Sequence, residues 1–455
     1  MRTASSRSIL PTLVCAILIA GRGVAAAPPP VSFSHDVAPL LVKHCQGCHG
    51  AEKTKGKYRV DTFDRLMTAG ESKSAPLTAG KPQASNLYRL ITAADEDDRM
   101  PQKADPLPAA QVELVRRWIA EGATFDGKNR TAPIADLSED GDRPVAPAVY
   151  RRPVPVAALA FRPDGGEIAV GGYHEVTLWK ADTGELTGRI AVASERVNAL
   201  AYSPDGARLA VAGGTPGTLG ELRICEAKDR GAGRVVERTG DALLAVRFSP
   251  DGSQIAAGGA DNAIRLIDAK TLKRTRLIEQ HADWIMDLAY SLDGAWLASA
   301  SRDKSARVFD VKTGAMQAAF LNHEEPLFGV AWTPDGKSLF TSGRDRRVRL
   351  WTMNEAKQTA EVATLVAEPF RVEVGAGMLF VTCADGIVRQ YDVTKRDLVR
   401  AYPKAPDWVY AIAIDAKHRR IAAGCYDGEV RVYDSEKGAM VTHFVAAPGY
   451  APHKE

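Results

Sequence analysis

The chain has 455 residues, of which 45% are hydrophobic and 25% are charged. These proportions are typical of globular proteins, and the length suggests about three domains. The formal net charge of +3 at pH 7 is far from the strongly basic balance of nucleic-acid-binding chains, so we expect no nucleic acid partner.

The first residues have the pattern of a secretory signal. Arg2 and Arg7 make a basic start, an apolar run covers residues 9–20, and a Val-Ala-Ala sequence offers a cleavage site. We expect residues 1–26 to be a signal peptide and the protein to be periplasmic or otherwise exported. The run is too short to span a bilayer, so no stable membrane span is expected after cleavage. Arg22 follows the run closely, which leaves cleavage itself open.

The most specific motif is Cys45-Gln46-Gly47-Cys48-His49. C-x-x-C-H is the attachment sequence of c-type haem, in which two thiols on one turn reach the two vinyl groups of a porphyrin and the histidine ligates the iron. A zinc site would need a second ligand pair, and a dithiol redox motif would not need the histidine. The motif predicts one covalent haem c, tethered by Cys45 and Cys48 and ligated by His49.

Four cysteines lie outside this motif. Cys15 belongs to the predicted signal, and the others are Cys225, Cys383 and Cys425. Because three is an odd number, a disulfide framework is not indicated, and we expect these three side chains to be buried as small hydrophobes.

Residues 30–127 form a predicted small all-α domain. Apolar residues at helical spacing lead into the haem motif, at Val37, Leu40, Leu41 and Val42. A second helix is predicted to begin at Pro108 and to end at Gly122, with one apolar face made of Val112, Val115, Trp118 and Ile119.

The sixth iron ligand has to come from a methionine or a second histidine. His35 and His44 are nitrogen alternatives, but His44 adjoins Cys45 and cannot reach the opposite face of the ring. Met67 is close to the motif in sequence and is expected in the core. Met100 stands before Pro101 on a loop that precedes the last helix.

These features resemble the class I cytochromes c, whose methionine–proline loop presents a thioether sulfur to the iron. The resemblance implies Met100 as the sixth ligand, which raises the haem potential and suits electron transfer. More narrowly, residues 33–122 resemble the cytochrome c domain of planctomycete secreted proteins. That resemblance rests on the approach over residues 37–41, the Met100-Pro101 loop, and the helix Leu114–Ile119 with its end at residues 121–123.

Residues 128–150 interrupt the apolar periodicity. Prolines at positions 133, 144 and 147 alternate with acidic residues. This composition predicts an extended linker rather than a third domain.

Internal repeats fill residues 151–450. An aromatic or aliphatic residue, usually before an acid, recurs at spacings of 46, 42, 42, 42, 40 and 42, at Trp179, Cys225, Ile267, Phe309, Trp351, Tyr391 and Tyr433. Pro-Asp-Gly turns and short alternating segments indicate about four strands in each unit. The extra residues near 213–220 predict a longer loop in the second unit.

The units resemble WD repeats, whose length is about 40 to 45 residues. The resemblance implies an all-β seven-bladed propeller, and a turn acid that hydrogen-bonds a histidine before the first strand and a tryptophan in the third. His323, Asp345 and Trp351 match this pattern. His281 and Asp303 match its histidine and its acid, with Phe309 in the place of the tryptophan. The last unit has its own fourth strand at residues 440–445, so closure between complete blades is expected.

We therefore expect a multidomain protein, with a monohaem cytochrome c domain followed by a WD-type propeller. The expected work is one-electron transfer, with the propeller docking a redox partner protein. No sequence motif for hydrolysis, phosphate binding or a metalloprotease is found, which favours an electron-transfer and binding protein over an enzyme. The alternatives left open are a haem-linked oxidoreductase whose propeller binds a substrate, and a haem-based redox or ligand sensor.

Overall fold

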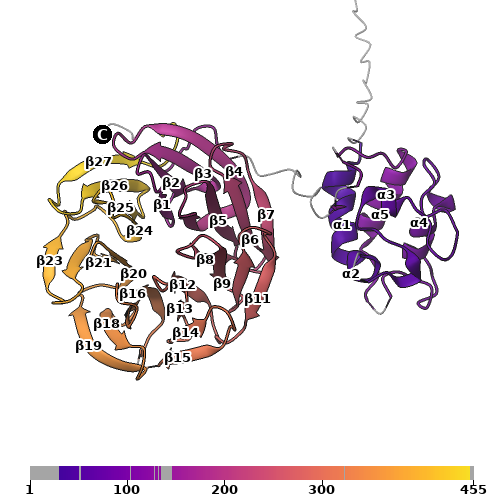
Figure 1. Ribbon diagram of the computed structural model, residues 1–455. Helices are drawn as coiled ribbons and strands as arrows, with labels where there is room; N and C mark the ends of the chain where they lie inside the picture. Colours follow the sequence, from indigo (N-terminus) through magenta and orange to yellow (C-terminus); the bar gives the residue numbers. More distant parts are fainter. Residues whose placement is uncertain are drawn as a thin grey trace, which may run out of the picture. The chain divides into compact units, whose positions relative to one another are not determined.

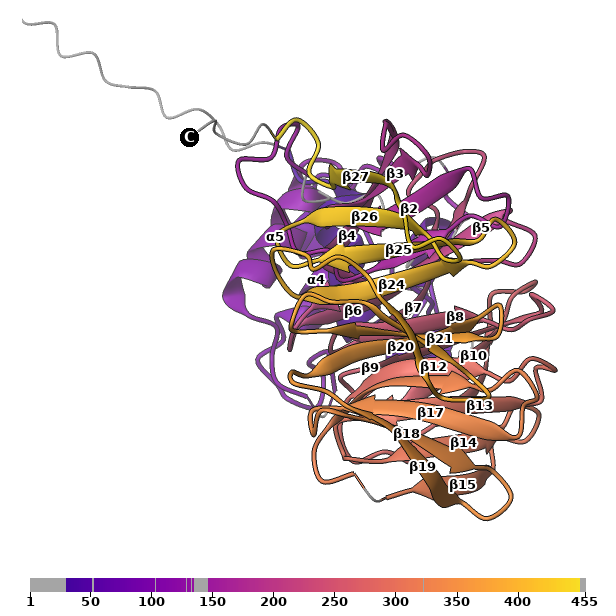
Figure 2. The same cartoon turned by 90° about the vertical axis from the view of Figure 1, so that its left-hand side faces the viewer.

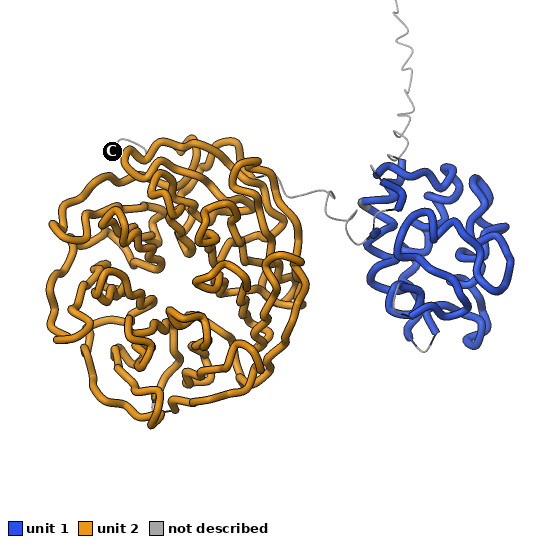
Figure 3. Tube along the Cα trace, viewed as in Figure 1, with its two compact units in different colours: residues 1–142 blue, residues 143–455 orange. Residues whose placement is uncertain are grey.

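The structure is a computed structural model, and it describes residues 30–50, 53–102, 104–127, 129–131, 133–134, 146–321 and 323–450. The chain divides into two compact units, Met1–Asp142 and Arg143–Glu455 (Figures 1 and 3). The predicted signal peptide, residues 1–26, lies outside the described residues, as does much of the predicted linker. No described helix is long and apolar enough to cross a membrane.

The first unit consists of short helices. They are η1 (Phe33–Val37), α1 (Ala38–His44), α2 (Gln46–His49), η2 (Lys55–Lys57), α3 (Phe63–Leu66), η3 (Pro82–Ala84), α4 (Asn86–Ile91) and α5 (Ala109–Ala120). The predicted helix after Pro108 is confirmed as α5, for which Pro108 is the N-cap. Gly122 follows with φ 110°, a backbone conformation that favours glycine and ends the helix.

An aromatic cluster lies in the core of this unit. The Phe33 ring lies 4.7 Å from that of Phe63 and 5.2 Å from that of Trp118, centroid to centroid. The Trp118 indole N–H donates to the Thr124 carbonyl at 3.0 Å, so its polar group is satisfied inside the core. This packing fixes α5 against η1, from which α1 leads to the haem motif.

The second unit is a ring of antiparallel sheets around a central axis (Figure 1). One sheet has seven strands: β1 (Leu159–Phe161), β2 (Glu167–Gly171), β3 (Tyr173–Lys180), β4 (Leu186–Tyr202), β5 (Arg208–Thr215), β6 (Leu219–Glu226) and β7 (Arg234–Thr239). Two four-stranded sheets follow: β8 (Leu243–Phe248), β9 (Gln254–Gly259), β10 (Ile264–Asp268) and β11 (Arg274–Ile278), then β12 (Ile285–Tyr290), β13 (Trp296–Ser301), β14 (Ala306–Asp310) and β15 (Met316–Phe320).

Three further four-stranded sheets complete the ring. They are β16 (Leu327–Trp332), β17 (Ser338–Gly343), β18 (Arg347–Thr352) and β19 (Lys357–Thr364); β20 (Pro369–Gly375), β21 (Met378–Cys383), β22 (Arg389–Asp392) and β23 (Leu398–Ala401); and β24 (Val409–Asp415), β25 (Arg420–Cys425), β26 (Glu429–Asp434) and β27 (Met440–Val445). Figure 2 shows the strands of these sheets crossing the side of the ring.

The prediction of seven separate blades is met only in part, because the first sheet is not divided. β4 is 17 residues long, pairs with β3 from Leu186 to Arg196, and continues to pair with β5 from Arg196 to Tyr202. The predicted long loop near residues 213–220 is also wrong, since Gly213, Gly214 and Thr215 pair with β6 as a lengthened hairpin. The uninterrupted strand β4 therefore joins the first seven strands into one sheet.

The ring closes through side-chain packing between its first and last sheets. Leu159 and Ile168 of the first sheet share one core cluster with Ala413 and Val432 of the last. β27 spans the residues predicted for a fourth strand and pairs with β26. Just before β1, the Val156 N–H donates to the Cys425 carbonyl at 3.0 Å. Cys225, Cys383 and Cys425 are all buried, as predicted.

The end of the predicted linker is held by the first sheet of the second unit. The Tyr150 hydroxyl donates to a carboxylate oxygen of Glu175 at 2.6 Å. Arg189 binds the same carboxylate and donates to the carbonyls of Pro147 and Ala148. Glu175 is buried and paired with a guanidinium, so this contact anchors the chain where it joins the propeller.

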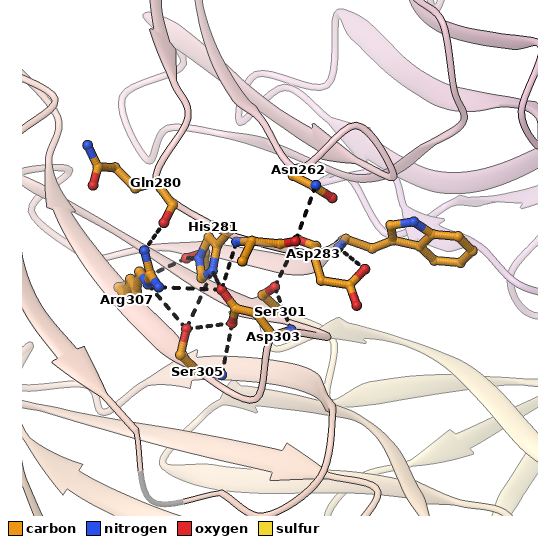
Figure 4. A network of polar contacts seen from close by, with 11 residues as sticks. Asn262, Gln280, His281, Asp283, Ser301, Asp303, Ser305 and Arg307 are labelled. Atoms are coloured by element: carbon orange, nitrogen blue, oxygen red, sulfur yellow. Dashed lines mark hydrogen bonds and ion pairs between the residues drawn. The ribbon is translucent and has the colours of Figure 1, made fainter.

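Networks of hydrogen-bonded side chains recur between the strands of the propeller. His323 contacts Asp345 through Nδ1 at 3.0 Å and Thr341 through Nε2 at 2.8 Å, and Trp351 donates to the same Thr341 hydroxyl at 2.7 Å. The expected partners are thus linked, but the tryptophan reaches the acid through threonine and histidine. Figure 4 shows the related network of His281, Asp303, Ser305 and Arg307.

Candidate haem-binding site

One cavity of about 380 Å³ lies within the first unit. Pockets for small molecules and cofactors usually measure roughly 300–1,000 Å³ and are mostly apolar. The predicted site residues Cys45, Cys48, His49 and Met100 all line this cavity. Apolar side chains complete much of the wall, among them Leu87, Leu90, Ile91 and Leu107. The fold therefore gathers the two thiols, the imidazole and the thioether around one space.

The haem motif forms a single turn directly after α1. Cys45 is the C-cap of α1, and its N–H donates to the Leu41 carbonyl at 3.0 Å. The His49 N–H donates in turn to the Cys45 carbonyl at 3.0 Å, which closes the turn of α2. Leu41 is buried in the core of the unit. The packing of α1 thus fixes the backbone positions of Cys45, Cys48 and His49.

Tyr58 holds the His49 ring. Nδ1 of His49 lies 3.3 Å from the Tyr58 carbonyl oxygen, and because a carbonyl only accepts, Nδ1 carries the hydrogen and donates. That tautomer leaves the lone pair on Nε2 for a metal, which is the usual arrangement of a ligating histidine. The two rings also meet edge to face, with centroids 5.7 Å apart.

Tyr58 is itself fixed at its other end. Its hydroxyl donates to the Leu66 carbonyl at 2.9 Å, and burial raises the pKa of the phenol, so the hydroxyl stays protonated. Sequence reasoning missed Tyr58. The contact with His49 is made by a backbone carbonyl, which any residue type carries, so no spacing rule marks it.

Cys45 is held in its neutral form. Burial, together with the nearby Cys48 thiol, raises the pKa of Cys45 to about 11. The side chain packs against the hydrophobic core of the unit. Cys45 would hold a porphyrin through a thioether bond, together with Cys48.

Met100 is positioned by its own backbone. Its N–H donates to the Leu90 carbonyl at the end of α4 at 3.0 Å, and the side chain packs against the core cluster. The Gln102 amide donates to the Asp97 carbonyl at 2.9 Å, which closes the loop around Met100. The peptide bond between Met100 and Pro101 is cis.

The other ligand candidates lie in different settings. Met67 packs against the core, as predicted, and is not among the residues that line the cavity. His44 lines the cavity, and its Nε2 is buried without a hydrogen-bond partner among the described residues. The side chain of His35 lies outside the described part of the structure. In the described residues no group of three or more His, Cys, Asp or Glu side chains could hold a metal ion.

The donor set fits haem c. Two thiols stand three residues apart, the imidazole has Nδ1 engaged, and a thioether faces the same mostly apolar space. Gly70 lets the wall close, since a Cβ at this position would lie 2.5 Å from the Gly56 carbonyl oxygen. The residues present would thus hold a porphyrin through Cys45 and Cys48 and its iron through His49 and Met100.

The fold and the site together define a class: a cytochrome-c-like domain joined to a WD-repeat propeller. Comparison with family models agrees with both halves. The model described as Planctomycete cytochrome C matches residues 45–103, which begin at the first thiol and include Met100. The model described as WD domain, G-beta repeat, matches residues 235–268, 272–310, 314–352 and 397–434. A search among curated proteins found no match.

Proposed function

We propose that this protein is an exported c-type cytochrome with one haem, which transfers single electrons and docks a redox partner protein through its propeller. The observation that carries the proposal is the convergence of Cys45, Cys48, His49 and Met100 on one cavity, with Nδ1 of His49 engaged by a carbonyl. A haem bound there supplies a one-electron iron couple. The signal-like first residues support export.

Each residue of the site has a distinct task in this proposal. Cys45 and Cys48 tether the ring, and the Tyr58 carbonyl orients His49 so that Nε2 is available to the iron. Met100 offers a neutral thioether, which favours the reduced state of the iron and raises its potential. The leucine and isoleucine side chains of the wall exclude water, which also favours the less charged state of the site.

The propeller serves as the docking platform. We count the ring as seven blades, of which the first two are fused through β4. Antiparallel blades present loops on two rigid faces, which suits protein binding, and WD-repeat propellers are generally platforms of this kind. The His323 network links side chains within one blade to each other, which is a structural role.

The test is to purify the full chain from a host that matures c-type cytochromes. We expect one haem per chain by pyridine haemochrome analysis, with haem retained after acid–acetone extraction because thioethers are covalent. The ferrous protein should be low-spin and six-coordinate. Haem that extracts freely would contradict c-type attachment, and a second haem per chain would contradict the monohaem proposal.

A further inference from the structure

One face of the propeller carries an exposed aromatic patch. The inner strand of each sheet begins where its neighbour ends, as Val409 of β24 pairs with Cys425 at the end of β25. Residues just before the inner strands and just after the second strands therefore gather on one face of the propeller. Trp408 and Tyr426 are 45% and 47% exposed there, and their ring centroids are 5.6 Å apart.

The patch extends across three neighbouring sheets. The Phe328 ring of β16 lies 6.1 Å from that of Phe370 in β20, which lies 4.5 Å from that of Tyr410 in β24. The ring centroids of Tyr410 and Tyr426 are 5.8 Å apart. Trp408 and Tyr426 are exposed, whereas Phe328, Phe370 and Tyr410 are half-buried. A contiguous, partly exposed aromatic surface of this kind is a feature of interaction sites.

The sheet β12–β15 shows what the same repeat position binds elsewhere in this chain. Asp283 and Trp284 precede β12, and Arg302 follows β13. The Arg302 guanidinium carbon lies 4.1 Å from the Trp284 ring centroid, and its Nε lies 3.5 Å from an Asp283 carboxylate oxygen. The tryptophan and the aspartate thus share one cation, through a cation–π contact and an ion pair.

The last sheet repeats this arrangement without the cation. The Trp284 N–H donates to Asp283 and the Trp408 N–H to Asp407, each at 2.8 Å. In both sheets the residue after the second strand donates its backbone N–H to the tryptophan carbonyl. The Arg302 nitrogen lies 3.0 Å from the Trp284 oxygen, and the Tyr426 nitrogen lies 2.8 Å from the Trp408 oxygen. Tyr426 therefore stands where Arg302 stands. Among the ion pairs of the described residues, none includes Asp407.

We propose that the guanidinium of an exposed arginine on a partner protein stacks on the exposed Trp408 ring and pairs with Asp407, beside the Tyr426 ring. The inference rests on the proposed docking function of the propeller and names the chemistry that the docking partner brings. Arginine fits better than lysine because its planar group stacks on an aromatic face while it pairs with a carboxylate. Tyr426 and Tyr410 widen the aromatic platform beside the cation.

The test uses the full haem-loaded chain labelled with 5-fluorotryptophan and observed by fluorine NMR. The Trp408→Phe variant assigns the Trp408 signal among the seven tryptophans. L-arginine amide is the probe, and L-citrulline amide, its neutral isostere, is the comparison. We expect a saturable shift of the Trp408 signal with the arginine probe and none with citrulline amide.

Two reciprocal substitutions sharpen the result. Tyr426→Arg gives the last sheet its own cation, so binding of the probe at Trp408 should weaken about tenfold. Arg302→Tyr removes the cation from Trp284, so a second binding signal should emerge there. Tyr173→Ala, which removes an exposed aromatic side chain from the first sheet, is the control and should leave binding unchanged.

Equal shifts with the two amides, or full binding in Tyr426→Arg, would overturn the inference. If Tyr426→Arg fails to fold, Asp407→Asn replaces it, and there we expect about fivefold weaker binding; unchanged binding would again overturn the inference. The haem spectrum and potential are recorded on the same samples. A normal haem without arginine binding refutes this inference alone, whereas absent covalent haem refutes the cytochrome proposal.

Discussion

The two units of this protein differ in whether the same polar contact recurs along the chain. In the propeller, an acid in the turn after the second strand pairs with an arginine four residues later in four successive sheets, as Asp261–Arg265, Asp303–Arg307, Asp345–Arg349 and Asp385–Arg389. In the haem unit, the contacts of His49 with Tyr58 and of Met100 with Leu90 occur once. A contact that recurs with the repeat maintains the repeat. The single contacts of His49 and Met100 instead position residues that line the cavity.

The largest effect on this difference between the two units is expected when the two thiols that would hold the haem are removed. Cys45→Ser combined with Cys48→Ser should abolish covalent haem, because no thioether can form. The propeller should keep its thermal unfolding transition, since the substitutions lie in the other compact unit. Haem staining after denaturing electrophoresis and calorimetry measure the two effects. Retained covalent haem would show that the attachment site lies elsewhere.

The next largest effect is expected at the sixth ligand. Met100→Ala should open this position and lower the haem potential by a sizeable part of the roughly 0.8 V range that axial ligands control. The ferric sulfur-to-iron absorption should disappear, and the ferrous protein should bind carbon monoxide. Potentiometry and absorption spectra provide the measurement. Met67→Ala is the matched control, and a ligand phenotype there instead would refute the assignment of Met100.

Inside the propeller, the recurring network should matter for stability and not for the haem. The side chains of His323 and Asp345 are 0% and 8% exposed, and His323→Ala leaves Asp345 and Thr341 without their histidine partner. We expect a loss of about 2–4 kcal/mol in the free energy of unfolding. Chemical denaturation measures it. His443→Ala, at a 63% exposed side chain paired with Glu429, should change stability by less than about 1 kcal/mol.

The same network predicts a pH dependence. Burial lowers the pKa of His323, so the unfolded chain takes up a proton before the folded one does as the pH falls below about 6.5. Burial alone would raise the pKa of Asp345, but hydrogen bonds from His323 and Arg349 outweigh it and bring the pKa to about 2. Stability should therefore fall from about pH 6.5 downward and fall further below about pH 4. In His323→Ala the first of these losses should be absent.

Local patterns allowed much of this structure to be predicted from the sequence. The turn at residues 45–49, the helix after Pro108 and the strand at residues 440–445 each depend on residues close in the chain, and the structure has these elements where they were expected. The recurring pair of turn acid and arginine was also readable, at a constant spacing of four, but only the histidine network had been expected.

What could not be predicted depends on the backbone or on distant parts of the chain. The fusion of the first seven strands arises because β4 continues through Arg196 without a turn, and no proline or tight-turn sequence separates its two halves. The place of Tyr58 beside His49 depends on a carbonyl. The site at Trp408 becomes visible only when the sheets are superposed, since Tyr426 and Arg302 share a position and not a residue type.

The smallest expected effect separates the two functions of Tyr58. Tyr58→Phe keeps the backbone carbonyl that accepts from His49 and the ring that packs on it, but it removes the hydroxyl that donates to Leu66. We therefore expect haem content, low-spin spectrum and potential to stay as in the parent protein, with a loss of about 1 kcal/mol in the stability of the haem unit. Thermal unfolding followed at the Soret band measures this loss. A change in potential or spin state would mean that the phenol acts on the iron site directly, and the carbonyl of Tyr58 would then not suffice to orient His49.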